Sequence, residues 1–229
     1  MATLATLQRR IVNCTQCERL ISHCRRVAQE KVKRYRDQEY WGKPIPSFGD
    51  PQAQLLIIGL APAAHGGNRT GRIFTGDRSG DWLYGALYDA GFASQPTSVH
   101  KDDGLVLNDC YITAAVHCAP PDNKPTPEEF AACRPYLLQE LTILRRVRVV
   151  VALGQIAFAA YLTARRELGF SLPAPLPRFG HDAHFMLDNV LLIGSYHPSQ
   201  QNTFTGRLTH DMFAAVFQRA KTTISSTLC

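Results

Sequence analysis

Four apolar runs along the chain predict buried strands. They cover residues 53–61, 106–118, 146–154 and 189–198, and glycine, proline or charged residues stand at most of their ends. Short apolar runs bounded by turn residues favour strands over amphipathic helices, whose apolar residues recur every three or four positions. We therefore expect a sheet that lies inside the molecule.

Helical periodicity fills the intervals between these runs. It predicts helices up to about residue 39 and over residues 79–92, 126–144, 155–167 and 205–222, while the Pro/Gly-rich residues 41–52 predict a loop. We expect Ser79 to cap the second helix and Gly91 to end it. Thr126, followed by Pro127 and two glutamates, is typical of a helix start.

The alternation of strands and helices predicts an α/β protein. Successive β-helix-β units favour a three-layer α/β/α fold around a central, mainly parallel, four-stranded sheet. The 229 residues are enough for one large domain, and they contain no internal repeat or low-complexity linker. We expect a single domain over residues 1–229 that begins with a helical segment over residues 1–40.

Three unusual segments follow predicted strands. Residues 59–80 hold six glycines, residues 117–125 read HCAPPDNKP, and residues 195–206 read SYHPSQQNTFTG. Ligands of parallel sheets bind at the carboxyl ends of the strands, so we expect these segments to converge on one cleft. The glycine-rich backbone suits either a phosphate or a flat base, although both common nucleotide-binding glycine motifs are missing from it.

The charge of the chain suggests a polyanionic partner. The formal net charge is +6, and the basic residues cluster between residues 25 and 36 and between residues 145 and 148. An ordinary basic surface is the alternative. No apolar run approaches the roughly 20 residues of a membrane helix, and the first residues do not resemble a secretion signal. We expect a cytoplasmic protein that does not contact a membrane.

Seven cysteines, an odd count, disfavour a disulfide framework in such a protein. Cys14 and Cys17 form a close pair, and Cys118 and Cys133 form a wider one. Four thiolates could bind zinc or an iron–sulfur cluster, although the wide second pair is unlike a zinc ribbon. Unligated buried cysteines are the alternative, and we expect this ordinary role for Cys24, Cys110 and Cys229.

The motifs resemble those of the type B, or family five, uracil-DNA glycosylases over nearly the whole chain. The matching stretches are GLAPAAHGGNRTGRIFTGDRSGDWL, YITAAVHCAPPDNKPTPEE and SYHPSQQNTFTGRLT. The resemblance implies a DNA repair enzyme that flips a deaminated base out of DNA and hydrolyses its N-glycosidic bond. It also implies a 4Fe–4S cluster, bound by Cys14, Cys17, Cys118 and Cys133.

The resemblance implies a pocket for the flipped base. Phe74 would stack on uracil, with plain core packing as the alternative for this ring. Asn123 would contact the Watson–Crick edge of the base through its amide. Ala114 stands where related enzymes carry an asparagine, so we expect a broader range of deaminated bases that includes hypoxanthine. Small residues would let the backbone close around the base and sugar: Gly59, Ala61, Ala63 and Gly66.

Two residues are candidates for the chemistry. His197 would donate a hydrogen bond to the departing uracil, unless it only caps a strand end. Asp77 would orient water or stabilise the cationic sugar, with capping of the following helix as the alternative. Asp81 is a weaker candidate, and the identity of any general base stays open.

The third motif implies contacts with DNA. Gln200 and Asn202, with the neighbouring Gln201 and Thr203, could reach phosphates or fill the space that the flipped base leaves. Arg207 is expected at the positive end of the last helix, where phosphate binding is favoured. A solvated loop is the alternative for each side chain. We expect a monomer, and two other hypotheses stay open: a nucleotide-binding enzyme, and a non-enzymatic iron–sulfur module that binds DNA or senses redox state.

Overall fold

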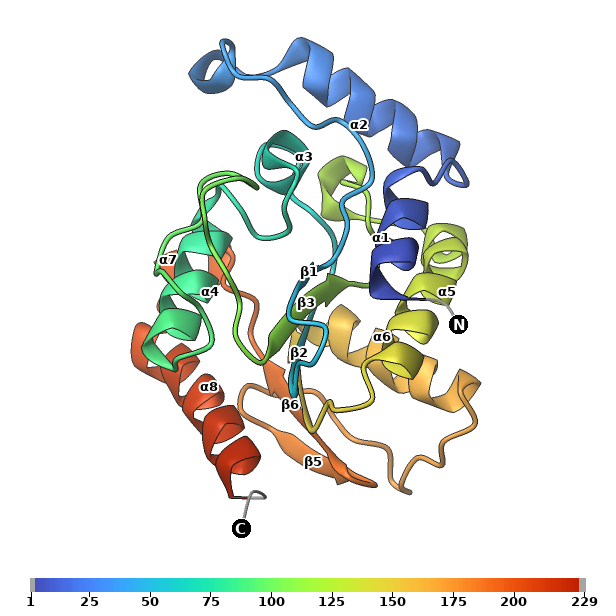
Figure 1. The fold of residues 1–229 in the computed structure, drawn as a ribbon, viewed down its shortest axis with the longest axis vertical. Helices are drawn as coiled ribbons and strands as arrows, with labels where there is room; N and C mark the ends of the chain where they lie inside the picture. The colour runs from blue at the N-terminus through green and yellow to red at the C-terminus, as the bar shows by residue number, and fades with distance from the viewer. Residues whose placement is uncertain (1–2, 227–229) are drawn as a thin grey trace.

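A six-stranded sheet forms the centre of the molecule in the computed structural model, which describes residues 3–226 (Figure 1). The four inner strands are parallel and run in the order β3-β2-β4-β6, and an antiparallel strand closes each edge. The predicted α/β class and parallel sheet are confirmed, but the predicted number of strands was too small. The strands are β1 (Phe48–Gly49), β2 (Leu55–Gly59), β3 (Cys110–Ala114), β4 (Val149–Leu153), β5 (His184–Leu187) and β6 (Val190–Ser195).

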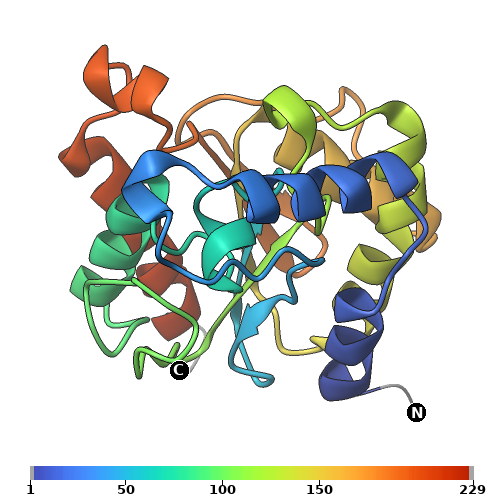
Figure 2. The same ribbon diagram turned by 90° about the horizontal axis from the view of Figure 1, so that it is seen from above.

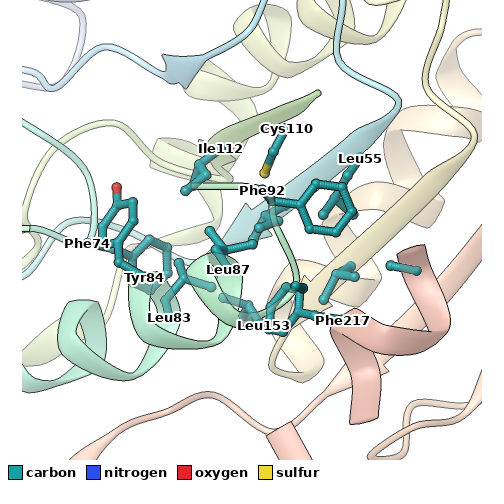
Figure 3. Packing of buried hydrophobic residues seen from close by; sticks show 14 of the residues in the cluster. Leu55, Phe74, Leu83, Tyr84, Leu87, Phe92, Cys110, Ile112, Leu153 and Phe217 are labelled. Atoms are coloured by element: carbon teal, nitrogen blue, oxygen red, sulfur yellow. The ribbon is translucent and has the colours of Figure 1, made fainter. Parts of the chain in front are cut away.

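Alternate residues of each inner strand face opposite sides of the sheet and build two cores. Leu55 and Ile57 pack against helices α4 (Arg78–Asp89) and α8 (His210–Ser225), and Figure 3 shows part of this core. Leu56 and Ile58 face the other layer. That layer consists of α1 (Leu4–Val12), α5 (Pro127–Ile143) and α6 (Gln155–Glu167). Burial on both faces explains why the strands are apolar throughout.

The N-terminal segment contains two helices where the sequence predicted one. The chain leaves the helical conformation after α1 and resumes it in α2 (Glu18–Glu30), so Cys14 and Cys17 lie at the break. Four shorter helical elements join the larger ones. They are η1 (Lys33–Tyr35), α3 (Gly67–Thr70), η2 (Pro121–Asn123) and α7 (Gln200–Phe204).

Helix boundaries confirm part of the sequence prediction. Thr126 caps α5 and exchanges hydrogen bonds with Glu129, as a capping box requires. Gly91 follows the end of α4 with a φ of 77°, which suits its predicted role as a stop. Ser79 does not cap α4, because Asp77 takes this position and accepts a hydrogen bond from the Gly80 N–H.

The last predicted helix is also corrected. Residues 205–209 form a connection rather than the first turn of a helix, and α8 begins only after its cap, Thr209. Among residues 3–226, no helix combines the length and apolar character that crossing a membrane requires. Cys229 lies outside the described residues.

Candidate active site

The segments that follow β2, β3 and β6 line one cleft of about 440 Å³, as the sequence predicted. Its volume suits a small planar ligand better than a long polymer. The cleft lies at the carboxyl ends of the parallel strands, where such sheets bind their ligands. The lining residues are Leu60, Ala61, Pro62, Ala63, Phe74, Asp77, Arg78, Ser79, Asn123, His197, Ser199 and Gln200.

Phe74 has an unusual backbone conformation in this cleft. Its φ is 52°, in the left-handed region that a bulky side chain rarely adopts. Such a conformation costs roughly 1–3 kcal/mol and persists only where the surroundings enforce it. The ring lies beside the imidazole of His197, with 5.8 Å between the ring centroids. Phe74 also belongs to the core beside α4, so the ring takes part in core packing and lines the cleft at the same time.

Two buried arginines hold the loop that carries Phe74. Arg72 donates hydrogen bonds to Thr75 (3.0 Å), Ser98 (2.7 Å) and Asp103 (2.6 Å). Arg69 donates to the carbonyl oxygen of Gly76 at 2.7 Å. These contacts hold Thr75 and Gly76, the two residues that follow Phe74, and thereby restrict the backbone that orients its ring.

Asp77 lies in the cleft and caps α4 at the same time. Its Oδ1 accepts a hydrogen bond of 3.1 Å from the Gly80 N–H. Burial raises the pKa of Asp77 above its ordinary value, and the N–H groups of Gly80 and Ser79 offset part of this rise. The two sequence interpretations of Asp77 are therefore compatible in the structure. Asp81 is exposed and does not line the cleft.

His197 follows β6 and lies half-buried on the cleft wall. Burial lowers its pKa to about 4, so the imidazole is neutral at physiological pH. Within residues 3–226, neither ring nitrogen has a hydrogen-bond partner, although the backbone carbonyl of His197 accepts from the Asn202 side chain at 2.8 Å. The ring is therefore free to donate to a ligand in the cleft.

The glycines of the first motif make room for the walls of the cleft. A Cβ atom at Gly59 would lie 2.8 Å from the Phe74 ring, and one at Gly66 would lie 1.9 Å from the Asp77 carboxylate. Both glycines thus let a functional side chain reach its position. The other two small residues of the predicted set, Ala61 and Ala63, line the cleft themselves.

Asn123 stands at the edge of the cleft on the η2 turn. Its φ is 56°, and its side chain is exposed. Asparagine tolerates this left-handed conformation better than most residues do. Ala114, at the end of β3, is buried and offers no polar group to a ligand.

The expected DNA-contact residues separate into three environments. Gln200 is exposed and lines the cleft. Asn202 supports His197 through its backbone, as described above. Arg207 does not lie at a helix start, because it precedes the cap of α8 and its guanidinium lies 4.5 Å from the Tyr196 ring centroid.

The sequence analysis missed Arg78, which also lines the cleft. Its guanidinium lies 4.3 Å from the ring centroid of Phe204 on α7, and its Nε donates to Thr203 at 3.4 Å. Phe204 is 67% exposed, which is unusual for a large apolar side chain. The position of Arg78 directly after Asp77 was the available signal.

A second, smaller cavity is lined by the four cysteines of the predicted cluster. Cys14, Cys17, Cys118 and Cys133 meet there from the α1–α2 break, the segment after β3, and α5. The residues around them are mostly apolar, and the backbone N–H of His117 donates to the sulfur of Cys133 at 3.3 Å. Within the described residues, no group of three or more His, Cys, Asp or Glu side chains is close enough to hold one metal ion.

Together, the parallel sheet and a cleft that contains a carboxylate and an imidazole define an α/β protein with a candidate small-molecule site. Comparison with known proteins identifies the family. The sequence profile of the uracil DNA glycosylase superfamily matches residues 46–221, and the chain belongs to this superfamily.

Curated relatives narrow the similarity further. The chain is 50% identical to the type-5 uracil-DNA glycosylase of Mycobacterium tuberculosis over 91% of this chain and 77% of the relative. It is 50% identical to the type-5 enzyme of Thermus thermophilus over 91% and 92% of the two chains. It is 46% identical to the type-5 enzyme of Pyrobaculum aerophilum over 92% and 89%. These matches favour the glycosylase over the two other hypotheses from the sequence.

Proposed function

We propose that the chain removes uracil and other deaminated bases from DNA by hydrolysis, with the flipped base bound in the cleft beside Phe74. The chain is a uracil-DNA glycosylase by its family and by the names of its relatives. One observation carries the site assignment. Phe74 has a strained backbone, and its ring lies in a cleft that also contains His197 and Asp77. Stacking on an aromatic ring is a common way to bind an unstacked base.

Hydrolysis breaks the bond between C1′ of the sugar and a ring nitrogen of the base, and the electron pair leaves with the base. The neutral imidazole of His197 donates a hydrogen bond to the negative charge that develops on the departing base. The ionised carboxylate of Asp77 stabilises the positive charge on the sugar. A water molecule then adds to C1′ and releases a proton, which leaves an abasic site.

We expect a broad range of base substrates, because the cleft offers few polar groups that could hydrogen-bond to a base and distinguish it from others. Ala114 is apolar, and Asn123 is exposed on a turn at the edge of the cleft rather than fixed inside it. A site that lacks buried hydrogen-bonding groups rejects analogues weakly, because no polar group is left unpaired when a different base binds. We therefore propose that hypoxanthine is a substrate alongside uracil.

The chemistry of the four cysteines that line this cavity suits a 4Fe–4S cluster. A cluster of four irons takes one thiolate per iron, so its ligands stand farther apart than those of a single ion. Burial raises the pKa of Cys133 to about 12, so the free thiol would be protonated, and binding iron would displace this proton. We propose that Cys14, Cys17, Cys118 and Cys133 hold the cluster. When bound, it would join the N-terminal helices to the sheet rather than take part in base removal.

The proposed substrate also requires contact with DNA around the cleft. We propose that Gln200 and Arg207 contact the backbone near the flipped nucleotide, while Asn202 positions His197. The cleft is complete within one chain, so we propose that a monomer in the cytoplasm carries out the reaction.

Base release from single-lesion duplexes tests this function. Oligonucleotides that carry one uracil, one hypoxanthine or only normal bases are treated with enzyme, and abasic sites are revealed by alkaline cleavage. We expect cleavage at uracil and at hypoxanthine and none at normal bases. Release of uracil alone would contradict the broad range, and no release from any duplex would contradict the glycosylase assignment.

A further inference from the structure

We infer that a basic surface on α2 and η1 forms a second contact with the phosphate backbone of duplex DNA, apart from the α7 region. This surface consists of Arg25, Arg26, Lys33, Arg34 and Arg36. The inference rests on the proposed function, because it takes DNA as the partner of the cleft.

The charges of this surface are unbalanced. Residues 25–36 contain six Lys or Arg residues and one carboxylate, Glu30. All five side chains of the surface are exposed, and none forms an ion pair with another described residue. Arg19 on the same helix differs, since it pairs with Glu129 at 2.7 Å. Unpaired, clustered cations favour contact with a polyanion.

The basic surface lies next to the cleft. The Tyr35 ring of η1 stacks under Arg69, with 3.8 Å between the guanidinium carbon and the ring centroid, and Arg69 holds Gly76 beside Asp77. The pKa of His23 on α2 is lowered, mainly by burial, and the carboxylate of Asp122 on η2 opposes this lowering. The His23 ring is also hydrogen-bonded to Arg26 at 3.1 Å. Figures 1 and 2 both place η2, drawn in lime, beside α2. The surface therefore borders the segment that carries Asn123.

The second basic cluster of the chain provides a natural contrast. Arg145, Arg146 and Arg148 lie between α5 and β4, at the amino ends of the parallel strands. This edge of the sheet is opposite the cleft, so a duplex with its base in the cleft cannot reach it. The surface beside the cleft carries five cations and the contrast cluster three, so each variant below removes three charges. Only the surface beside the cleft is expected to bind DNA.

Matched charge removal tests the inference. In one variant Arg26, Arg34 and Arg36 are each changed to Gln, and in the control Arg145, Arg146 and Arg148 are each changed to Gln. Affinity for an undamaged duplex is measured by fluorescence anisotropy at several salt concentrations. We expect the first variant to bind more weakly, with its log–log salt slope reduced by about 2 to 3, because each lost phosphate contact removes about 0.9. We expect the control to retain the affinity and slope of the unchanged protein.

Two further measurements keep the outcome clear. The single-turnover rate of uracil release at saturating protein should stay unchanged in the first variant, since the cleft is intact. Acetylation of Lys33 should slow when duplex is added, while acetylation of Lys221 on α8 should not. Equal weakening by both variants, or no protection of Lys33, would overturn the inference. If the unchanged protein released no base, this would instead contradict the proposed function. Binding to an undamaged duplex could still be measured, so the two failures can be told apart.

Discussion

The Phe74 ring lies directly over the backbone of Gly59 in the cleft wall. The ring occupies the space that a Cβ atom at Gly59 would need, and its own backbone has a φ of 52°. The sequence showed that small residues were required in this motif, but it suggested that they surround the base directly. At Gly59 and Gly66 the structure gives a different reason, since each glycine admits one wall residue of the cleft. Such a pairing depends on tertiary contacts and cannot be predicted from spacing.

A methyl group at residue 59 should disable the cleft without unfolding the protein. In Gly59→Ala the new Cβ would lie 2.8 Å from the Phe74 ring and force it to move. We expect the single-turnover rate of uracil release to fall on the order of 100-fold, because small misplacements in an active site are costly. Gly85→Ala is the control, since no atom outside the backbone of its own helix lies within 4 Å of the added carbon. Equal rates for both variants would contradict the stacking role of Phe74.

Asp77 allows its charge to be tested apart from its capping role. Asparagine caps helices as well as aspartate does, so Asp77→Asn should leave the thermal stability nearly unchanged. The rate of base release should fall on the order of 100-fold, which corresponds to about 3 kcal/mol of lost charge stabilisation.

The pH dependence of the rate gives a second test of Asp77. Burial raises the pKa of this carboxylate above its ordinary value, so the rate should decline as the pH falls through that pKa. His197 stays neutral down to a pH of about 4 and should not add a limb near neutral pH. Asp77→Asn should flatten the acidic limb, and a limb that persists in this variant would assign it to another group.

At the scale of elements, α5 connects the sheet to the four-cysteine cavity. Its start follows from the local sequence, because the capping box needs only Thr126 and Glu129. The local sequence does not predict which face of α5 is buried. Glu140 is fully buried on it and accepts hydrogen bonds from Ser47 (2.5 Å) and Thr113 (2.6 Å). A carboxylate in the core contradicts the hydrophobic pattern, and only partners from other elements make it possible.

Glu140 should make the unfolding free energy depend on pH. Burial raises its pKa from 4.5 to about 7, so the folded protein binds this proton more tightly than the unfolded chain does. Stability from this group is present at low pH and is lost as the pH rises from 4.5 through 7. Glu140→Gln should therefore gain about 3 kcal/mol relative to the unchanged protein between pH 4.5 and pH 8, measured by urea unfolding.

Glu128→Gln is a control on the same helix. Its exposed carboxylate has a lowered pKa, mainly through the Thr126 side chain, so removing it should have the opposite sign. A flat difference between Glu140→Gln and the unchanged protein would contradict the raised pKa of Glu140.

The edge strands show where sequence patterns fail at this scale. β1 has only two residues and lies in a segment that the prolines and glycines marked as a loop. β5 forms a hairpin with β6 through a tight turn at Asp188, whose φ is 52°. Its pattern is mixed because one side is exposed, so it lacks the continuous apolar run of the inner strands.

At the scale of the whole molecule, α2 is attached beside the four-cysteine cavity, whereas α1 packs on the core that faces α5 and α6. α2 buries Leu20, Ile21 and Cys24 against a small cluster that includes Cys118 and Ala119. This contact is much smaller than the two cores beside the sheet. The ligand set was predicted through family resemblance, and spacing alone left it open because Cys118 and Cys133 are too widely separated for a common metal motif.

Removal of iron should therefore loosen α2 before the sheet. After oxidation and chelation, we expect protease cleavage between residues 13 and 40, weaker binding to undamaged duplex, and a thermal midpoint lower by on the order of 10 °C. The far-ultraviolet signal of the remaining helices should persist. A purified protein without iron that keeps the same midpoint and protease resistance would contradict the cluster assignment.

The location of the flipped base is the most direct test of the active site. A crystal structure with duplex DNA that carries one 2′-fluorinated deoxyuridine, which resists cleavage, would show the base before release. We predict that the uracil ring lies in the cleft against Phe74, with His197 in hydrogen-bond reach of its oxygen and Asp77 facing the sugar. A base that stays stacked in the duplex, or that binds away from Phe74, would contradict this assignment.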